Sequence, residues 1–551
     1  MEKLGPNSAN SSPLTPLIFL ERAATVSGDS PSIVYNKTVY TWAQTHRRCL
    51  RLASALSGHL HISSGDVVSV ISQNTPAMYE MHFGVPMSGA VLNTINVRLD
   101  ARTISALLLH SSARVLFADE LFLPLARSAV SVLPNPPLLL PVDEPSTNSS
   151  TYNHLTYEFL LSLGDPDFQW VRPATEWAAV VLNYTSGTTS SPKGVVHSHR
   201  SVFLAAVNSL TAWPLPLHPV YLWTLPMFHA NGWCYPWAVA AAAGTNICLR
   251  SFDGPAIFDA IAENRVTHLC AAPVVLAMLA DTDRVLPNQV QILTAGSPPP
   301  AAVLRRVEAL GFVVTHAYGL TETGSFAVSC AWKGDEWNGL PEAERAVLKS
   351  RQGVRTAVME AADVVDETGE SVARDGETRG VVVLRGGYLM MGYLADGEAT
   401  AEAVKGGWFY TGDVAVVHPD GYMEIKDRAK DVIISGGENI SSVEVESVIH
   451  GHPAVGEVAV VARPDERWGE TPCAFVKVKA GVKGAAPTEA ELIGWCRERM
   501  PHYIVPKTVV FLPELPKTST GKIQKYILKN IAREMGPAAA GVAPVSPTSR
   551  I

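Results

Sequence analysis

Short apolar runs alternate with amphipathic segments along most of the chain, as far as Arg428. Runs of strand length occur at Val67 to Ser72, Val115 to Ala118 and Ala178 to Tyr184, and turns and helical patterns lie between such runs. This alternation predicts α/β layers. Proline-rich stretches such as Leu133 to Pro145 interrupt the alternation and indicate loops.

The last part of the chain has a different pattern, which predicts a compact α+β unit. Ser441 to Glu444 and Thr488 to Glu491 have the spacing of helix capping boxes, and the second helix is expected to reach about Arg499. Three apolar runs predict strands of this unit: Val458 to Ala462, Cys473 to Val478 and Val505 to Leu512.

A hairpin signal precedes this unit and indicates the domain boundary. Asp420-Gly421 separates Val416-Val417 from Tyr422-Met423, and glycine tolerates the positive φ that hairpin turns need. The boundary is therefore expected near Lys430. The predicted division comprises a disordered N-terminus (1–16), a large domain (17–428), a small domain (429–533) and a flexible tail (534–551).

The composition narrows the class of protein. A chain of 551 residues with 47% hydrophobic content is long enough for more than one core. The net charge of −8 gives no global electrostatic reason to bind nucleic acid, so any phosphate chemistry must be local. The seven cysteines are an odd number, widely spaced and without a Cys-x-x-Cys pair, which favours a reducing compartment.

The two ends of the chain bear on localisation. The first sixteen residues are polar and lack the apolar core of a secretory signal. The apolar stretch from Tyr235 to Leu249 is shorter than the ~20 residues needed to span a bilayer, which predicts a buried wall and not an integral membrane protein. Ser549-Arg550-Ile551 has the small-basic-aliphatic character of the peroxisomal Ser-Lys-Leu signal, and an uninterpreted tail is the alternative.

A run of small polar residues follows the apolar strand that ends at Tyr184. Thr185 to Lys193 offers hydroxyls, a glycine that lets the backbone approach an anion, and a lysine as counter-charge, as a polyphosphate requires. Pro192 and Gly194 stand where a Walker loop needs Gly and Ser or Thr, which disfavours an ordinary P-loop ATPase. A flexible linker rich in Ser, Thr and Gly is the alternative interpretation.

Two further strings place a carboxylate beside glycine. Tyr318 to Gly324 offers an aromatic face for a nucleobase, a hydroxyl for phosphate and Glu322 for Mg²⁺; a turn with a solvated glutamate is the alternative. Asp413, on the glycine turn that starts at Tyr410, could accept both ribose hydroxyls or be an ordinary turn aspartate. Arg428 could reach the same ribose or be a surface arginine.

A second loop with a lysine lies near the C-terminus, from Pro516 to Ile523. Lys522 directly follows a glycine there, and its ammonium would neutralise the charge that develops on a phosphoryl group under attack. A solvated surface lysine is the alternative interpretation.

Taken together, in this order and with these separations, the four strings resemble those of the adenylate-forming superfamily of acyl-CoA synthetases, coumarate-CoA ligases, luciferases and peptide-synthetase adenylation domains. The resemblance extends from about Pro16 to Ile531 and is nearest to plant-type acyl-activating enzymes with a peroxisomal tail. It implies a large, multi-layered α/β N-terminal domain that binds ATP and the acyl group, followed by a small, mobile α+β C-terminal lid. It also implies ATP, Mg²⁺ and coenzyme A as cofactors.

The resemblance further implies roles for individual residues. Lys522 would catalyse adenylation, Thr321 and Glu322 would contact phosphate and Mg²⁺, and Lys430 would be the hinge. The residues implied in binding ATP or coenzyme A are Thr185, Ser186, Gly187, Thr188, Thr189 and Lys193 for phosphate, Gly296, Ser297, Pro298 and Tyr318 for adenine, Asp413 and Arg428 for ribose, and Gly437 for pantetheine.

The acyl side is implied for His229, Trp233, Trp237, Gly319 and Phe326. His229 is assigned to shaping the pocket, because a histidine in apolar company is a satisfied core residue about as often as a catalytic one. His197 and His199 lie two positions apart without a third ligand, so no metal site is expected there.

The implied reaction joins a carboxylic acid to AMP, with release of pyrophosphate, and then transfers the acyl group to coenzyme A. The bulky pocket residues favour a small to medium monocarboxylic acid, either short, medium or branched aliphatic or of the benzoate or cinnamate type. Two alternatives are an adenylating enzyme with another acceptor, luciferase-like or carrier-loading, and an inactive acyl or nucleotide binder. The expected partners are the acid and a peroxisomal import receptor, and cytoplasmic residence is the alternative localisation.

Overall fold

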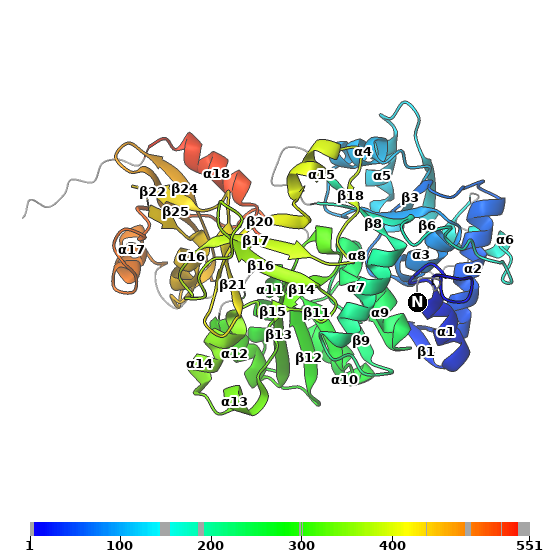
Figure 1. Cartoon of the computed structure of the whole chain (residues 1–551), viewed down its shortest axis with the longest axis horizontal. Helices are drawn as coiled ribbons and strands as arrows, with labels where there is room; N and C mark the ends of the chain where they lie inside the picture. Colours follow the sequence, from blue (N-terminus) through cyan, green and yellow to red (C-terminus); the bar gives the residue numbers. More distant parts are fainter. Residues whose placement is uncertain are drawn as a thin grey trace, which may run out of the picture.

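Within residues 5–143, 155–185, 192–296, 299, 301–436, 438–479, 486–518 and 521–537, the computed structural model shows four β-sheets with helices packed on them. Figure 1 shows the C-terminal elements, in orange and red, at one end of the long axis and the blue and cyan N-terminal elements at the other. The expectation of a large α/β part followed by a small α+β part is confirmed.

The first sheet has the strand order β18-β8-β7-β4-β3-β5-β6. Its five strands from β7 to β6 are parallel, because helical crossovers connect them, whereas β8 and β18 are antiparallel additions. The strands are β3 (Val67–Ile71), β4 (Val91–Thr94), β5 (Val115–Asp119), β6 (Leu138–Val142), β7 (Ala179–Tyr184), β8 (Gly194–Ser198) and β18 (Gly392–Tyr393).

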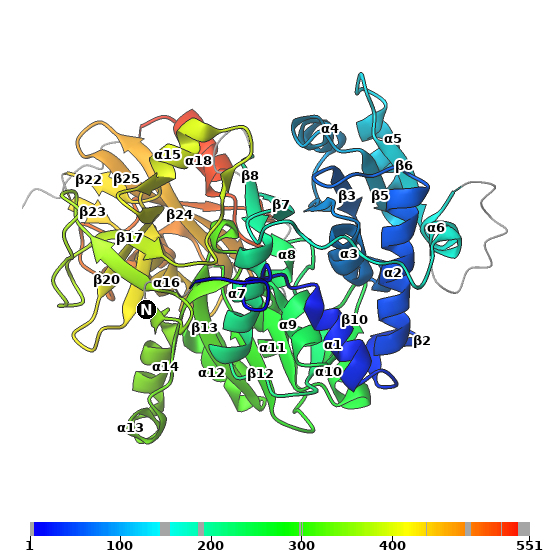
Figure 2. The same ribbon diagram turned by 45° about the vertical axis from the view of Figure 1, so that its right-hand side comes forward.

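Helices on this side include α2, whose Thr41 and Gln44 form a complete capping box, and α3, which packs against it. Figure 2 shows this blue and cyan part standing beside the green part, with α2 running along its edge. The helices between residues 18 and 163 are α1 (Ile18–Val26), α2 (Trp42–Gly58), α3 (Pro76–Met87), α4 (Ala101–His110), α5 (Leu123–Val130) and α6 (Tyr157–Leu163).

The second sheet has the strand order β15-β14-β13-β12-β11-β9-β10-β1-β2. Six of its strands, from β13 to β1, are parallel. The strands are β1 (Pro31–Tyr35), β2 (Thr38–Thr41), β9 (Val220–Trp223), β10 (Thr245–Cys248), β11 (His268–Ala271), β12 (Val290–Thr294), β13 (Phe312–Gly319), β14 (Phe326–Ser329) and β15 (Val354–Arg355). The helices of this region are α7 (His199–Thr211), α8 (Ala230–Trp233), α9 (Tyr235–Ala241), α10 (Gly254–Asn264), α11 (Pro273–Ala280), α12 (Ala301–Ala309), α13 (Gly334–Asn338) and α14 (Glu342–Ser350).

The apolar stretch from Tyr235 to Leu249 forms α9 and β10 of this region, and its residues are mostly buried. It is therefore the buried wall that its short length predicted. No helix in the described part of the chain is long and apolar enough to cross a membrane.

A third sheet carries the predicted hairpin. β20 and β21 are antiparallel partners joined around Gly421, which has the expected positive φ of 85°. The strands are β16 (Ala361–Val365), β17 (Gly380–Arg385), β19 (Val404–Lys405), β20 (Trp408–Val417) and β21 (Met423–Arg428), and α15 (Gly397–Ala403) precedes β19.

The fourth sheet belongs to the C-terminal unit, in which the predicted strands and helices occur. The capping box at Thr488 is complete, whereas Ser441 caps its helix by accepting from the Glu444 amide. The strands are β22 (Ile433–Ser435), β23 (Glu438–Ile440), β24 (Val455–Asp465), β25 (Gly469–Val478) and β26 (Thr508–Phe511). The helices are α16 (Ser442–His450), α17 (Glu489–Arg497), which ends two residues before Arg499, and α18 (Lys525–Glu534).

Candidate active site

The polar strings predicted from the sequence lie at the carboxyl ends of parallel strands. Thr185 follows β7, Gly296 lies just beyond β12, and Gly319 ends β13. In open α/β sheets, ligands bind at this edge because the loops that follow the strands can diverge there. The two large sheets therefore bring strings that are far apart in sequence to one side of the fold.

The two ends of the phosphate-loop candidate are bonded to each other. The Thr185 amide donates to the Lys193 carbonyl over 3.0 Å, and the Lys193 amide donates to Thr185 Oγ1 over 3.3 Å. These bonds continue the antiparallel pairing of β7 with β8. Seven predicted residues lie outside the described part of the chain: Ser186, Gly187, Thr188, Thr189, Ser297, Pro298 and Gly437.

Tyr393 connects this loop to Glu322. The Lys193 ammonium lies 4.7 Å from the centre of the Tyr393 ring, and the Tyr393 hydroxyl donates to Glu322 Oε1 over 2.8 Å. Burial raises the pKa of Glu322, and the hydrogen bond from Tyr393 opposes that rise. Tyr393 did not appear among the predicted site residues, because its place depends on the pairing of β18 with β8.

The turn that carries Thr321 and Glu322 is fixed from both sides. Gly319 precedes it, where an added Cβ would lie 2.6 Å from the Ser325 carbonyl oxygen, so only glycine fits. His197 Nε2 donates to the Thr321 carbonyl over 2.8 Å. Burial lowers the pKa of His197 to about 4, so this histidine is neutral at pH 7 and orients the turn.

Asp413 and Arg428 form a paired corner between β20 and β21. They are directly opposite in the register, and Arg428 Nε lies 3.4 Å from Asp413 Oδ1. The Tyr318 hydroxyl donates to Asp413 Oδ2 over 2.6 Å, so the predicted aromatic and the predicted ribose ligand touch. Asp413 is only 5% exposed, and its amide donates to Thr411 Oγ1. The carboxylate is thus held in place before any ligand binds.

Lys522 comes to this corner from the C-terminal unit. Its amide donates to Thr518 Oγ1 over 3.1 Å, and its carbonyl accepts from the Thr518 amide over 2.6 Å, which closes a tight loop. Burial lowers the pKa of Lys522 to about 8; the charge of Arg428 lowers it further and that of Asp413 raises it. Lys522 is therefore within electrostatic reach of the pair that the large domain supplies.

His229 also interacts electrostatically with Lys522. Burial lowers the pKa of His229 to about 4, and the charge of Lys522 contributes to the same shift. A neutral imidazole agrees with its assignment to the shape of the site. Lys522 is therefore within electrostatic range of both Asp413 and His229.

The backbone after His229 is left-handed. From Ala230 to Cys234, five consecutive residues have positive φ, between 38° and 64°, so the short element α8 is a left-handed turn. Such a conformation costs roughly 1–2 kcal/mol per non-glycine residue, so surrounding contacts must stabilise it. Asn183, at the end of β7, donates to Asn231 Oδ1 over 2.5 Å, which links the turn to the strand that leads into the phosphate loop.

The other acyl-side residues differ in their exposure. Phe326 is 2% exposed on β14, and Trp237 is fully buried, donating from Nε1 to the His82 carbonyl over 3.2 Å. Trp233 is only partly buried. Asn74 also belongs to this region, because its amide group bonds to the backbone of Trp223, Leu225 and Met227, just before His229. Sequence patterns carried no signal for Asn74 or Asn183.

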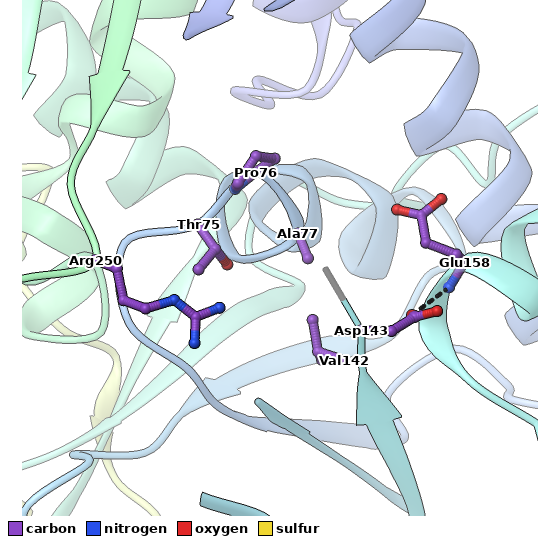
Figure 3. Close-up of a pocket in the computed structure, with 7 residues that line it drawn as sticks. All are labelled: Thr75, Pro76, Ala77, Val142, Asp143, Glu158 and Arg250. Atoms are coloured by element: carbon purple, nitrogen blue, oxygen red, sulfur yellow. Dashed lines mark hydrogen bonds between the residues drawn. The ribbon is translucent and has the colours of Figure 1, made fainter. Parts of the chain in front are cut away.

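The small cavity drawn in Figure 3 is lined by none of the predicted site residues. Its volume is about 10 Å³, and inside its wall the Glu158 amide donates to Asp143 over 3.1 Å. This volume is about that of one water molecule, so the cavity is not an acyl pocket. Its lining residues are Thr75, Pro76, Ala77, Val142, Asp143, Glu158 and Arg250.

Comparison with known proteins agrees with this geometry. The model of the AMP-binding enzyme family matches residues 20–394, and that of the AMP-binding enzyme C-terminal domain matches residues 444–522. The chain belongs to this family of adenylate-forming enzymes. Within the family it is an AMP-forming acid–CoA ligase.

Individual relatives support this assignment. The chain is 60% identical to the 2-methylpropanoate–CoA ligase CCL4 of Humulus lupulus over 98% of this chain and 99% of that protein. It is 58% identical to the probable acyl-activating enzyme 5, peroxisomal, of Arabidopsis thaliana, over 97% and 99% of the two chains. Among solved structures, an anthranilate CoA ligase in complex with anthranoyl-AMP superposes with a TM-score of 0.83 at 25% identity, over 96% of this chain and 99% of that one.

Proposed function

We propose that this ligase activates a small monocarboxylic acid, with short branched aliphatic acids of the 2-methylpropanoate type as the favoured class. The observation that carries the adenylation step is the electrostatic interaction of Lys522, from the C-terminal unit, with the Asp413–Arg428 pair of the large domain. The identity of 60% to a 2-methylpropanoate–CoA ligase over nearly the whole chain supports the substrate class.

ATP fits the charges at the site. Asp413 would accept the ribose hydroxyls, and Tyr318 would stack on adenine while its hydroxyl continues to orient Asp413. Arg428 would contact the ribose together with Asp413, and Lys193 and Lys522 would face the phosphates as counter-charges. Ser186, Gly187, Thr188 and Thr189 would complete the phosphate clamp, and Gly296, Ser297 and Pro298 would flank the base.

Glu322 is the residue that would bind Mg²⁺. A partly buried carboxylate is stabilised by a compensating charge, and the side-chain partner of Glu322 in the described part of the chain is a neutral hydroxyl, that of Tyr393. A hard cation on a carboxylate oxygen would hold Glu322 ionised against the effect of burial. When bound, the cation would neutralise phosphate charge. The Thr321 carbonyl, bonded to His197, would keep this turn in place.

The proposed reaction has two steps, and Lys522 would act in the first. In the first step the substrate carboxylate attacks the α-phosphorus of ATP, the bond to pyrophosphate breaks, and the acyl-AMP remains. Lys522 would stabilise the negative charge that develops on the transferred group. In the second step the coenzyme A sulfur attacks the acyl carbon, and AMP leaves. Lys430, at the start of the C-terminal unit, would be the hinge that removes Lys522 and brings the Gly437 segment over the site.

The acyl side supports a limit on substrate size. Trp233, Trp237 and Phe326 are bulky, and Trp233 belongs to the left-handed turn that follows His229. An apolar wall of this kind favours short or branched chains, because one extra methylene in a filled pocket costs roughly 1–3 kcal/mol. Benzoate and cinnamate types are the second class to test.

A panel of acids measured with and without coenzyme A tests the proposal. We expect pyrophosphate release with 2-methylpropanoate and similar short branched acids, and acyl-CoA and AMP when coenzyme A is added. Preference for benzoate or cinnamate would contradict the substrate class. Pyrophosphate release without thioester formation would contradict coenzyme A as the acceptor.

Peroxisomal residence is part of the same proposal. It is supported by the tripeptide Ser549-Arg550-Ile551, which lies outside the described residues, and by the name of the Arabidopsis thaliana relative. A fluorescent fusion that exposes residues 534–551 at its end is expected to enter peroxisomes through the import receptor. The same fusion without the last three residues is the control, and equal distribution of both would indicate the cytoplasm instead.

A further inference from the structure

The hydrogen bonds within the Lys522 loop do not by themselves fix the position of the loop relative to the large domain. The bonds between Thr518 and Lys522, with a third from the Gly521 amide to the Thr518 carbonyl over 2.9 Å, join residues of the same loop. They determine the direction of the lysine relative to the C-terminal unit. They do not determine where that lysine lies relative to Asp413 and Arg428, which belong to the large domain.

One contact with the large domain is polar. Arg98 Nη1 donates to the Thr518 carbonyl over 3.3 Å, between residues 420 positions apart. Arg98 lies in the segment between β4 and α4, and β4 is the neighbour of β7, the strand that leads to the phosphate loop. A hydrogen bond from a guanidinium to a carbonyl is stronger than one between neutral groups. It can also be broken and remade without leaving an apolar surface exposed.

A second contact is steric. Gly521 has a φ of 80°, and a Cβ added there would lie 2.5 Å from Cγ1 of Val274. Val274 is the second residue of α11, on the other large sheet, and it is 38% exposed. The backbone at Gly521 therefore lies directly against the large domain, one residue before the lysine.

These two contacts come from different sheets and meet the loop on either side of its turn. Thr518 and Gly521 are also bonded to each other, through the Gly521 amide and the Thr518 carbonyl. Movement of the C-terminal unit about Lys430 would separate both contacts together. In this structure both contacts occur together with the electrostatic interaction between Lys522 and the Asp413–Arg428 pair.

We propose that Arg98 and Val274 are positioning residues for the first half-reaction, which dock the Lys522 loop against the large domain. This inference rests on the proposed role of Lys522. Neither residue acts on the substrate directly; both act by holding Lys522 beside Asp413 and Arg428. Their loss affects acyl-AMP formation and spares transfer of a supplied acyl-AMP to coenzyme A.

Arg98→Ala tests the polar contact. We expect pyrophosphate release to fall about tenfold, the effect of losing one hydrogen bond from a charged group. Thioester formation from supplied acyl-AMP is expected to stay at the wild-type rate, which also shows that the variant is folded. Arg98→Lys should recover part of the loss. Arg102→Ala is the matched control, because Arg102 carries the same charge on the adjoining α4 with an exposed side chain beside Asp100, and it should behave as wild type.

A double-mutant cycle tests the steric contact. Gly521→Ala should reduce adenylation by more than Arg98→Ala, because the added Cβ collides with Val274 and the φ of 80° is strained. Val274→Ala removes the Cγ1 atom, so the double variant should recover part of the loss. This coupling should appear in adenylation and be absent from the thioester half-reaction. Gly494→Ala, where an added Cβ meets nothing within 4 Å, is the control.

Two results would overturn the inference: wild-type adenylation in Arg98→Ala, or equal losses in both half-reactions. Lys522→Ala, assayed in parallel, separates this failure from that of the proposed function. If Lys522→Ala loses adenylation while Arg98→Ala does not, the docking inference is wrong and the role of Lys522 stands. If Lys522→Ala retains adenylation, the proposed function itself fails.

Discussion

The Asp413–Arg428 corner, which is the proposed ribose site, and the Lys522 loop are both charged, but they are held in different ways. Asp413 and Arg428 are cross-strand neighbours in one hairpin, and Tyr318 bonds to Asp413 from the adjoining sheet of the same domain. Lys522 reaches them from the C-terminal unit, through contacts that Arg98 and Gly521 make across the domain boundary. The corner is thus preorganised, whereas the lysine depends on docking.

This difference matches the demands of a two-step reaction. The adenosine ribose is present both in ATP and in the acyl-AMP, so its ligands are needed throughout. A lysine that stabilises charge during adenylation is needed only once, and its removal opens the site for a second substrate. Variants of the two regions should therefore differ in which half-reaction they damage.

Lys522→Ala has the largest expected effect. Adenylation should fall about 10²–10³-fold, because a preorganised charge opposite the developing negative charge is lost. Transfer from supplied acyl-AMP to coenzyme A should continue. Pyrophosphate release and thioester formation measure the two steps separately. Lys517→Ala, in the same loop but paired with Glu457, is the control; equal loss of both half-reactions in Lys522→Ala would refute its assigned role.

Asp413→Ala should come next and should damage both half-reactions. We expect kcat/KM for ATP and for supplied acyl-AMP to fall about 100-fold each, since two hydrogen bonds from ribose to a carboxylate are lost. Asp420→Ala removes a carboxylate from the turn of the same hairpin, where it pairs with Arg351, and serves as control. A loss confined to one half-reaction would contradict the ribose assignment.

Lys430→Pro reverses the pattern expected for Lys522. Proline fixes φ near −65°, so a hinge at this position would become stiff, and thioester formation should fall tens of fold, roughly the 2 kcal/mol of a misfitted backbone. Adenylation should be affected less, because the Lys522 loop is already docked on the large domain in this structure and need not move for that step. Lys430→Ala keeps the backbone free and is the control. Unimpaired thioester formation in Lys430→Pro would show that the hinge lies elsewhere.

The smallest expected effect concerns pH. Because burial lowers the pKa of Lys522 to about 8, the ammonium is present below that pH and is lost above it. For the free enzyme, kcat/KM for adenylation should fall about tenfold per pH unit above this value. Lys522→Arg, which stays charged, should abolish this fall. The thioester half-reaction should not decline over the same range, because the attacking thiol is increasingly ionised there.

Sequence patterns were sufficient for many elements of the fold. The apolar runs at β3, β5 and β7, the capping residues Ser441 and Thr488, and the hairpin around Gly421 each depend on neighbouring residues alone. The family could be predicted because each motif is a short run of residues and the order of the motifs can be read along the chain. Strand ends were less accurate: β24 extends beyond the predicted run at both ends, since its long partner β25 continues the pairing.

The partner of Asp413 illustrates what pattern alone could not determine. Counting back from the turn pairs Val417 with Met423 and would place Asp413 opposite Asp427. A bulge between Val414 and Ala415 shifts the register by one residue, so Arg428 is opposite instead. Since a shift of one residue turns every side chain to the other face, the ion pair depends on this bulge.

By itself, the sequence determined the α/β and α+β character of the two parts and the family, and it proposed the residues that would handle ATP. Only the tertiary structure decided that Tyr393 joins Lys193 to Glu322, that Asn183 supports the left-handed turn after His229, and that Arg98 and Val274 meet the Lys522 loop. The physical reason is range. Caps, turns and apolar periodicity act between neighbours, whereas these contacts join residues dozens to hundreds of positions apart and exist only once the sheets and the two domains have packed.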